Sequence, residues 1–274
     1  MLVKSGAMLK KARDSGYAVC AFNIINMETV QAVISAAVAE KAPVILQTSE
    51  KAITYAGLDY LSSLMKVAAK SPVHVAIHLD HGKSLCTVKS CIKSGYTSVM
   101  IDGSMLPYKE NIKLTKSVVA YARGRATVEA ELGTIGDSGN YTDPNQAEDF
   151  VRRTKTDLLA VAIGTKHGLH KGKVSLRYSL LKEIGEKIHI PLVLHGSSHL
   201  KPGEIKKCMK LGIAKFNFDS DLRSAFMQAL KKGSELTTRG RRVVMEDPRE
   251  VLGIARLAAQ KAAAEKIRLC SVRR

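Results

Sequence analysis

The 274-residue chain contains no tryptophan, and only 5% of its residues are aromatic. Stacking on single-stranded nucleic acid depends on aromatic side chains, so this composition gives that function little support. No apolar run approaches the roughly 18 residues that a membrane span requires. Residues 1–6 lack the apolar stretch and the small-residue cleavage site of a secretory signal. We therefore expect a soluble, cytoplasmic protein that has no contact with a membrane.

Cysteine is too sparse for a disulfide framework. The chain has 5 cysteines, an odd number, and none of them forms a CxxC pair. Cys86 and Cys91 lie five residues apart in an expected helix, a spacing that does not suit two ligands of one metal ion. We expect free thiols.

Acidic residues are few relative to basic ones. There are 25 Asp and Glu against 43 Lys and Arg, which gives a formal net charge of +18. Such an excess attracts phosphates, nucleic acid or anionic surfaces without choosing among them. The basic residues are scattered through the expected helices, so we expect weak polyanion binding and no dedicated nucleic-acid partner.

Short β-branched or apolar runs alternate along the chain with amphipathic segments, which is the pattern of βαβ units and a parallel sheet. The expected strands are residues 17–24, 43–49, 74–81, 98–103, 126–133, 158–164, 190–196 and 213–219. The clearest of the expected helices are residues 27–39, 59–69, 108–122 and 202–211. A length near 250 residues is typical of one barrel domain.

Eight strands with eight crossovers predict a closed (β/α)8 TIM barrel that spans residues 1–274 as a single domain. An open doubly wound sheet is the alternative, but no GxGxxG follows the first expected strand. Residues 247–267 are expected to form an added C-terminal helix, because Asp247-Pro248 supplies an N-cap followed by a proline at the first helical position.

Three histidines end separate expected strands, and each is followed by glycine. They are His81, His167 and His195. The carboxyl ends of barrel strands meet at one mouth, where active sites lie. Three imidazoles suit a catalytic zinc that keeps one position open for substrate. A lone histidine at a strand end is usually an ordinary hydrogen-bonded residue, but three at one mouth favour a metal site.

Carboxylates accompany these histidines. Asp80 directly precedes His81, so it can act as a proton donor or acceptor beside the metal, with structural support as the alternative role. Glu129 and Glu131 share one face of a strand. Two carboxylates in a barrel interior are costly unless a cation or hydrogen bonds meet them, which favours metal or substrate contact.

Two loops carry the features of a phosphate site. Gly196, Ser197 and Ser198 follow the seventh expected strand, and Asn217, Phe218, Asp219 and Ser220 end the eighth and precede a helix. Barrel phosphate sites commonly use these loops, with backbone N–H groups and a helix N-terminus directed at the anion.

Several strings along the chain resemble, in order, those of class II aldolases acting on fructose 1,6-bisphosphate or tagatose 1,6-bisphosphate. They are Ala21-Phe-Asn-Ile, His78-Leu-Asp-His-Gly, Ser98-Val-Met-Ile-Asp-Gly-Ser, Glu129-Ala-Glu-Leu-Gly, Ala160-Val-Ala-Ile-Gly-Thr-Lys-His-Gly and Pro191-Leu-Val-Leu-His-Gly. The resemblance spans almost the whole chain. It implies Zn²⁺ held by His81, His167 and His195, with Asp80 as the proton donor to the aldehyde oxygen in the condensation direction.

The resemblance also implies roles for residues that their positions alone do not assign. Gly168 and the loops at 196–198 and 217–220 are implied for the dihydroxyacetone phosphate end of the substrate, and Ser49 and Arg249 for the other phosphate. Glu131 is implied as a ligand for an alternative metal position. A monovalent cation near the phosphate and a homo-oligomer, dimer or tetramer, are implied as well.

The chain departs from the family pattern at two motifs. Residues 134–142 are shorter than the mobile loop of the family, and Asp137 is the candidate to replace its carboxylate. Gly196-Ser-Ser-His199 stands where fructose-type enzymes often have Gly-Gly-Ser-Gly, whereas tagatose-type strings, closer to Gly-Ala-Ser-Asp, tolerate a larger residue, so the sugar choice is left open. The shortened loop keeps open a second function, a non-catalytic barrel that binds sugar phosphates, although all three histidines and Asp80 are present.

Overall fold

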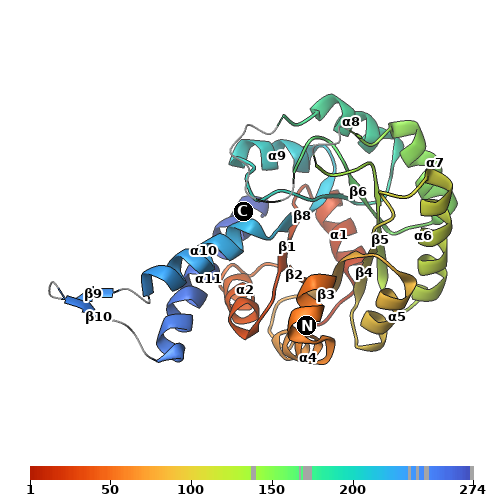
Figure 1. Ribbon diagram of the computed structural model, residues 1–274. Coiled ribbons are helices and arrows are strands. Elements are labelled where there is room, and N and C mark those ends of the chain that lie inside the picture. The colour runs from red at the N-terminus through yellow and green to blue at the C-terminus, as the bar shows by residue number, and fades with distance from the viewer. Residues whose placement is uncertain are drawn as a thin grey trace.

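A computed structural model of the protein describes residues 1–136, 140–166, 168, 175–233, 236–238, 241–243 and 247–271. Eight parallel strands close into a barrel in chain order, with the first pairing with the eighth (Figure 1). They are β1 (Val19–Asn23), β2 (Val44–Ser49), β3 (Val75–Gly82), β4 (Ser98–Ile101), β5 (Thr127–Leu132), β6 (Leu158–Val161), β7 (Leu192–Leu194) and β8 (Ile213–Phe218). The predicted TIM barrel is confirmed, and the open sheet is excluded.

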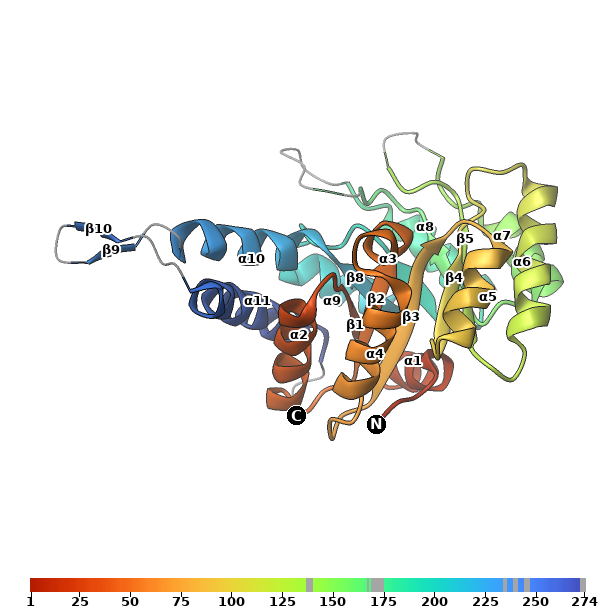
Figure 2. The same cartoon turned by 60° about the horizontal axis from the view of Figure 1, so that its bottom comes forward.

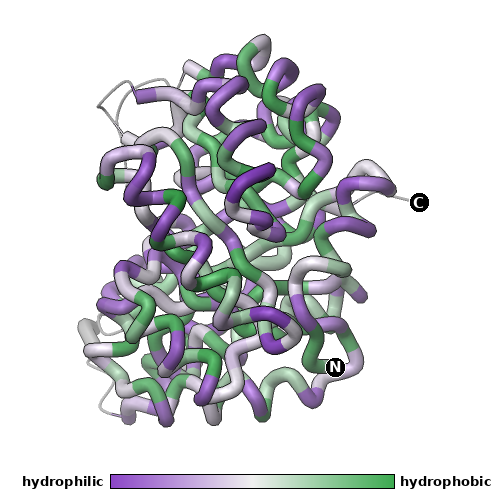
Figure 3. Tube along the Cα trace, turned by 90° about the vertical axis from the view of Figure 1, so that its right-hand side faces the viewer, coloured by the Kyte–Doolittle hydropathy of each residue, from purple (hydrophilic) through white to green (hydrophobic). Residues whose placement is uncertain are grey.

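Helices surround this barrel (Figures 1 and 2). They are α1 (Ser5–Asp14), α2 (Met27–Ala39), α3 (Glu50–Ala56), α4 (Leu58–Ala68), α5 (Leu85–Lys93), α6 (Tyr108–Ala122), α7 (Pro144–Thr154), α8 (Tyr178–Lys187), α9 (Pro202–Lys210), α10 (Ser220–Gly233) and α11 (Pro248–Cys270). Hydrophobic and hydrophilic residues alternate along the outer helices (Figure 3), as expected where one face packs on the strands. Within the described residues, no helix is long and apolar enough to cross a membrane.

The period of two in each strand divides the core into an outer and an inner layer. Cys20 and Phe22 of β1 belong to the large apolar cluster between the strands and the helices. Val19 and Ala21 of the same strand belong to a smaller cluster inside the barrel. The inner layer fills the amino-terminal half of the barrel, and the polar residues at the strand ends are left to form the mouth.

Helix α1 closes the bottom of the barrel, a role that the sequence pattern did not predict. Met8, Leu9 and Ala12 belong to the inner apolar cluster. Gly6 donates its N–H to Oγ1 of Thr127, the first residue of β5, at 2.9 Å. The helix therefore lies across the amino-terminal ends of the strands, at the end of the barrel opposite the mouth.

The carboxyl-terminal part of the chain extends the molecule to one side. Helix α11 packs against α2 and α10, and the antiparallel pair β9 (Leu236–Thr238) and β10 (Arg241–Val243) projects beyond α10 and α11 (Figures 1 and 2). Asp247 caps α11, because its side chain accepts the N–H of Arg249. The predicted added helix is confirmed and continues to Cys270; the β9–β10 hairpin was not predicted.

Candidate active site

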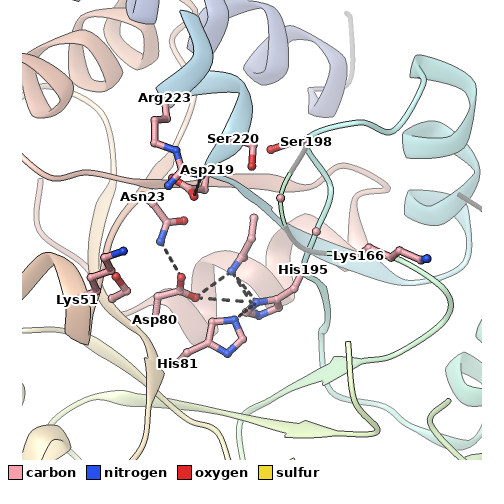
Figure 4. Close-up of a pocket in the computed structure, with 14 residues that line it drawn as sticks. Asn23, Lys51, Asp80, His81, Lys166, His195, Ser198, Asp219, Ser220 and Arg223 are labelled. Atoms are coloured by element: carbon pink, nitrogen blue, oxygen red, sulfur yellow. Dashed lines mark hydrogen bonds and ion pairs between the residues drawn. The ribbon is translucent and has the colours of Figure 1, made fainter. Parts of the chain in front are cut away.

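A cavity of about 270 Å³ opens at the carboxyl ends of the strands (Figure 4). Its lining comes from most of the strand ends and the loops that follow them. The lining residues are Asn23, Ser49, Lys51, Asp80, His81, Lys166, Gly168, His195, Gly196, Ser198, Asn217, Asp219, Ser220 and Arg223. The barrel thus gathers residues from Asn23 to Arg223 around one space, as expected for the mouth of this fold.

Two of the three predicted metal ligands face each other in this cavity. Nε2 of His81 lies 3.0 Å from Nδ1 of His195. The remaining ring nitrogens contact carboxylates: Nδ1 of His81 lies 2.9 Å from Oδ2 of Asp102, and Nε2 of His195 lies 2.8 Å from Oε1 of Glu129. Histidines that bind a metal ion usually have one ring nitrogen on a carboxylate or another acceptor and the other ring nitrogen directed at the metal position. His81 and His195 show this arrangement, with Nε2 of His81 and Nδ1 of His195 close together.

The donor set around this point fits a zinc ion. Asp80, His81 and His195 each offer a ligand atom within 4.8 Å of the others. The third predicted ligand, His167, lies outside the described residues. Two inward imidazole nitrogens and a neighbouring carboxylate are the N and O donors that Zn²⁺ accepts. The ligand roles themselves remain predictions.

The backbone turns His81 into the mouth. Alternation along β3 would place His81 on the face opposite Asp80, but His81 has a φ of 50°, in the left-handed region. The register with β4 shifts between Leu79 and Gly82. A Cβ at Gly82 would lie 2.6 Å from the carbonyl oxygen of Met100, so the residue after His81 must be glycine. Non-glycine residues in this conformation cost conformational energy and are enriched at functional sites.

A second acidic cluster lies beside His81. Burial alone would lower the pKa of His81, but Asp80, Asp102 and Glu131 raise it to about 9. Burial raises the pKa of Glu131 to about 8, and the charge of Asp102 acts in the same direction. Oε2 of Glu131 lies 3.8 Å from Nδ1 of His81 and, among the described residues, accepts no hydrogen bond. His81, Asp102 and Glu131 can also share a metal ion, which fits the alternative metal position predicted for Glu131.

Asp80 is held by two amides. Asn23 Nδ2 donates to its Oδ2 at 2.7 Å, and Asn217 Nδ2 donates to its Oδ1 at 3.1 Å. Burial opposes ionisation, but His81 and His195 lower the pKa of Asp80 below its usual value. A fixed, ionised carboxylate beside the inward histidine nitrogens can accept a proton from a bound hydroxyl.

Glu129 does not reach the mouth. It lies two residues before Glu131 on β5, roughly 6–7 Å away along the strand and closer to the amino-terminal end of the barrel. Its Oε2 receives a hydrogen bond from Lys215 Nζ at 2.6 Å, and both side chains are fully buried. The expectation of metal or substrate contact is wrong for Glu129, because the cation that meets it is a lysine.

The phosphate candidates divide into those that line the cavity and those that do not. The lining includes Ser49, Gly168, Gly196, Ser198, Asn217, Asp219 and Ser220. Ser197 instead donates to the carbonyl of Leu194, and the Phe218 ring packs on Phe22 in the outer core. Arg249 pairs with Asp247 and lines a different cavity with α2 residues. Asp137, the candidate loop carboxylate, lies outside the described residues.

Several residues at or near the site were missed by sequence reasoning. Lys51 and Arg223 line the cavity, and Asn23, Asp102 and Lys215 contact the central residues. The alternation of side chains along a strand could have revealed two of them, Lys215 and Asn23. Lys215 occupies the same face of β8 as the predicted Asn217, and Asn23 ends β1 on its inner face. Lys51 and Arg223 lie in helices after the strands, where strand periodicity carries no information.

Lys166 is the lysine that the sequence brings nearest to the predicted ligands. It lines the cavity, but its side chain points away from Asp80, His81 and His195 (Figure 4). A lysine that forms a Schiff base must reach the substrate carbonyl. This orientation argues against that role.

Comparison with known proteins identifies the family. The model of class II fructose-bisphosphate aldolases matches residues 3–273. The YdjI aldolase from Escherichia coli K12 is 34% identical, with a TM-score of 0.89 over 99% of this chain and 98% of that one. A putative fructose-1,6-biphosphate aldolase from Coccidioides immitis is 26% identical, with a TM-score of 0.88 over 97% and 96% of the two chains.

The fold is shared more widely. Fructose-bisphosphate aldolase from Campylobacter jejuni is 21% identical, with a TM-score of 0.82 over 98% of this chain and 95% of that one, and this likeness concerns the fold alone. The family model and the alignment with the E. coli aldolase cover nearly the whole chain. This chain belongs to the class II fructose-bisphosphate aldolase family and is an aldolase, a carbon–carbon lyase.

Proposed function

We propose that the protein is a zinc-dependent ketose-1,6-bisphosphate aldolase that reversibly cleaves fructose 1,6-bisphosphate to dihydroxyacetone phosphate and glyceraldehyde 3-phosphate. The observation that carries this proposal is the convergence of Asp80, His81 and His195 at the barrel mouth, within reach of one ion. Tagatose 1,6-bisphosphate is the alternative substrate, favoured by the string Gly196-Ser-Ser-His199. The family membership and this cluster favour an enzyme over a barrel that only binds sugar phosphates.

His81, His167 and His195 are the proposed zinc ligands, and Nε2 of His81 and Nδ1 of His195 are the atoms that would bind the ion. Bound zinc would act as a Lewis acid that polarises the ketone and stabilises the enediolate, so no lysine nucleophile is required. Glu131 is the proposed ligand for an alternative metal position, supported by its buried oxygen that accepts no hydrogen bond within the described part of the chain.

Asp80 is the proposed proton-transfer residue. Its lowered pKa keeps it ionised at neutral pH, ready to accept the proton of the C4 hydroxyl during cleavage and to return it to the aldehyde oxygen in condensation. The amides of Asn23 and Asn217 orient both carboxylate oxygens, so the group does not rotate away from the substrate.

Phosphate binding is proposed for the loops after β7 and β8. Gly168, the segment 196–198 and the segment 217–220 are proposed for the ketone phosphate, with a monovalent cation nearby. The N-terminus of α10 supports this choice, because helix N-termini attract anions. Ser49 is proposed for the distal phosphate, and the positive charges of Lys51 and Arg223 in the same cavity support binding of a second anion.

We also propose that residues 1–274 form one domain, that the protein acts in the cytoplasm, and that it assembles as a homo-oligomer, either a dimer or a tetramer. An apolar groove of about 360 Å³ next to the cavity supports self-association. Ile25, Tyr55 and Met227 line this groove and are exposed in the single chain. If Arg249 contacts the distal phosphate, a second copy supplies it, because within one chain it lines a cavity that shares no residue with the active site.

The test combines metal analysis with coupled assays of fructose and tagatose bisphosphate cleavage. We expect purified protein to contain zinc, to lose activity on chelation and to regain it with Zn²⁺. The fructose epimer is expected to be cleaved faster. Full activity in protein shown to be free of metal would reject the zinc mechanism, and binding of sugar phosphate without turnover would support the non-catalytic barrel.

A further inference from the structure

A column of buried polar groups runs through the barrel from its bottom to the mouth. Ser5 Oγ of α1 lies 2.7 Å from Ser98 Oγ, which lies 2.7 Å from Nδ1 of His78. Nε2 of His78 lies 3.2 Å from Nζ of Lys215, and the ion pair of Lys215 with Glu129 continues the column to His195. Neither the proposed proton transfer nor the proposed phosphate binding uses the buried groups between Ser5 and Glu129.

Lys215 is not available to substrate. Its side chain is fully buried, it is absent from the cavity lining, and its Nζ is directed at Glu129 and His78. Burial and the Lys215 charge hold the pKa of His78 well below its usual value, so His78 is neutral. Its Nε2 then accepts a hydrogen bond from Lys215, and its Nδ1–H donates to Ser98. Lys215 is therefore held in a buried ion pair with Glu129.

The hydrogen bonds of the column also select the tautomer of His195. Oε2 of Glu129 accepts from Lys215 at 2.6 Å, and its Oε1 lies 2.8 Å from Nε2 of His195, where a carboxylate oxygen accepts and the ring nitrogen donates. Nδ1 then carries the ring lone pair and accepts the Nδ2–H of Asn217, 3.1 Å away. This lone pair is directed at Nε2 of His81.

We propose that Lys215 and Glu129 form a positioning pair that fixes His195 in the Nε2–H tautomer and directs its Nδ1 into the active site. The inference deepens the proposed function, because it rests on His195 being a metal ligand. Lys215 holds the Glu129 carboxylate in place through its 2.6 Å contact, and Glu129 holds the ring through Nε2. The ammonium group of Lys215 contacts His78, which contacts Ser98 of β4, and Ser98 contacts Ser5 of α1. These contacts hold the ammonium group in place.

A purely stabilising role explains this pair poorly. Bringing two charges into a barrel interior costs desolvation that their attraction barely recovers, and apolar replacements of such pairs are often neutral or better. Outer groups that orient a metal-binding histidine, by contrast, typically change metal affinity when they are replaced. The two roles therefore predict different behaviour when both charges are removed together.

Two variants and one control test the proposal. Glu129→Gln removes the charge but keeps the shape, and its amide can donate to Nε2 and so favour the Nδ1–H tautomer. Lys215→Met leaves a buried carboxylate unpaired, so it is combined with Glu129→Gln in a double variant that keeps the interior neutral. Tyr96→Phe is the matched control, because it removes the buried 2.7 Å hydrogen bond to Thr48 outside the column.

The measurements are the ¹⁵N shifts of the His195 ring in metal-free protein, the affinity for Zn²⁺ by chelator competition, the visible spectrum with Co²⁺, and the melting temperature. We expect Glu129→Gln and the double variant to fold, to shift His195 toward Nδ1–H, and to bind Zn²⁺ about 10–100-fold more weakly. Tyr96→Phe should lower the melting temperature without changing the tautomer or the affinity.

The inference is overturned if folded Glu129→Gln and double variants keep the Nε2–H tautomer and bind Zn²⁺ within about twofold of wild type. It is also overturned if Tyr96→Phe lowers the melting temperature as much as Glu129→Gln does and loses as much affinity for Zn²⁺. Failure of the wild type to bind zinc would reject the proposed function alone, because the tautomer is read without metal and still decides the role of the pair.

Discussion

The carboxylate of Asp80 is the residue on which the proton transfer is proposed to depend. Asp80→Asn removes the proton acceptor but leaves a side chain of the same size between Asn23 and Asn217. We expect kcat to fall about 10²–10⁴-fold, the usual contribution of a positioned acid or base. Coupled cleavage assays at saturating zinc measure this effect.

The control for Asp80→Asn is Asp14→Asn, which breaks an exposed pair with Lys10. Exposed pairs contribute little, so its activity should equal that of wild type. Zinc content must be measured in each variant, since a loss of metal would mimic a loss of proton transfer. Wild-type kcat in a zinc-replete Asp80→Asn protein would contradict the proposed role.

His81 links metal affinity to pH. In metal-free protein its raised pKa of about 9 keeps the ring protonated at neutral pH, with Nε2–H able to donate to Nδ1 of His195. A metal binds only the neutral ring and must displace this proton. We expect zinc affinity to rise about tenfold per pH unit from pH 7 toward 9 and then to level off.

Titration calorimetry at pH 8 in buffers of different ionisation enthalpy counts the protons released when zinc binds. Zinc affinity that is independent of pH between 7 and 9 would show that His81 is neutral before metal binds. The same shift stabilises the metal-free fold below pH 6.5, the unperturbed histidine pKa, and this contribution is lost as pH rises through about 9.

The loop between β7 and α9 depends on one glycine. Gly196 has a φ of 65°, and a Cβ there would lie 2.5 Å from the carbonyl oxygen of Lys166. Gly196→Ala should cost at least the ~1–2 kcal/mol of a left-handed residue. It should also raise KM, because the displaced loop carries Ser198.

Gly203→Ala is the control at the start of α9, where an added Cβ meets nothing within 4 Å. Removing glycine from a compatible position typically stabilises by about 0.4–1 kcal/mol. Thermal unfolding and KM for the bisphosphate are compared between the two variants. If the two variants changed stability and KM equally, the close approach of Gly196 to the carbonyl oxygen of Lys166 would not be the cause of the effect at Gly196.

Element boundaries followed the local sequence where periodicity and caps agreed. The expected helices at 27–39 and 108–122 match α2 and α6, and Asp247-Pro248 marks the start of α11. Helix α1 and the β9–β10 hairpin were missed, because neither belongs to the repeating strand–helix pattern. Only packing against the inner barrel residues reveals why α1 is present.

Arg249 allows a test of the assembly. In the single chain its side chain is 89% exposed and pairs with Asp247, away from the active-site cavity. If a second copy supplies it, Arg249→Ala protein retains a site that an intact partner can complete. Asp80→Asn protein provides that partner, because its own site is inactive while its Arg249 is intact.

Co-assembly of the two variants should restore about a quarter of wild-type activity if the protein is a dimer, since half of randomly mixed dimers are mixed and each has one complete site. Each variant alone should remain weakly active. Mixing without any recovery would assign Arg249 to its own chain. If Arg249→Ala protein has wild-type activity, Arg249 does not contribute to the proposed distal phosphate site.

Local sequence patterns were sufficient to predict the barrel and the side chains that end its strands. A period of two assigns each residue to a face, and the order of strands and helices leaves few topologies. From this, the meeting of His81, His195 and Asp80 could be predicted. The inward turn of His81 could not, because it depends on a left-handed residue and a register shift against β4.

The partner that each inward residue meets depends on contacts between distant strands. Periodicity says that Glu129 and Glu131 share a face, but depth in the barrel separates them, so one meets Lys215 and the other lies near His81. Lys215 and Glu129 are 86 residues apart, and their contact exists because the closed barrel brings β5 and β8 across its interior. Contacts of this kind depend on barrel closure and strand register, which no local pattern contains.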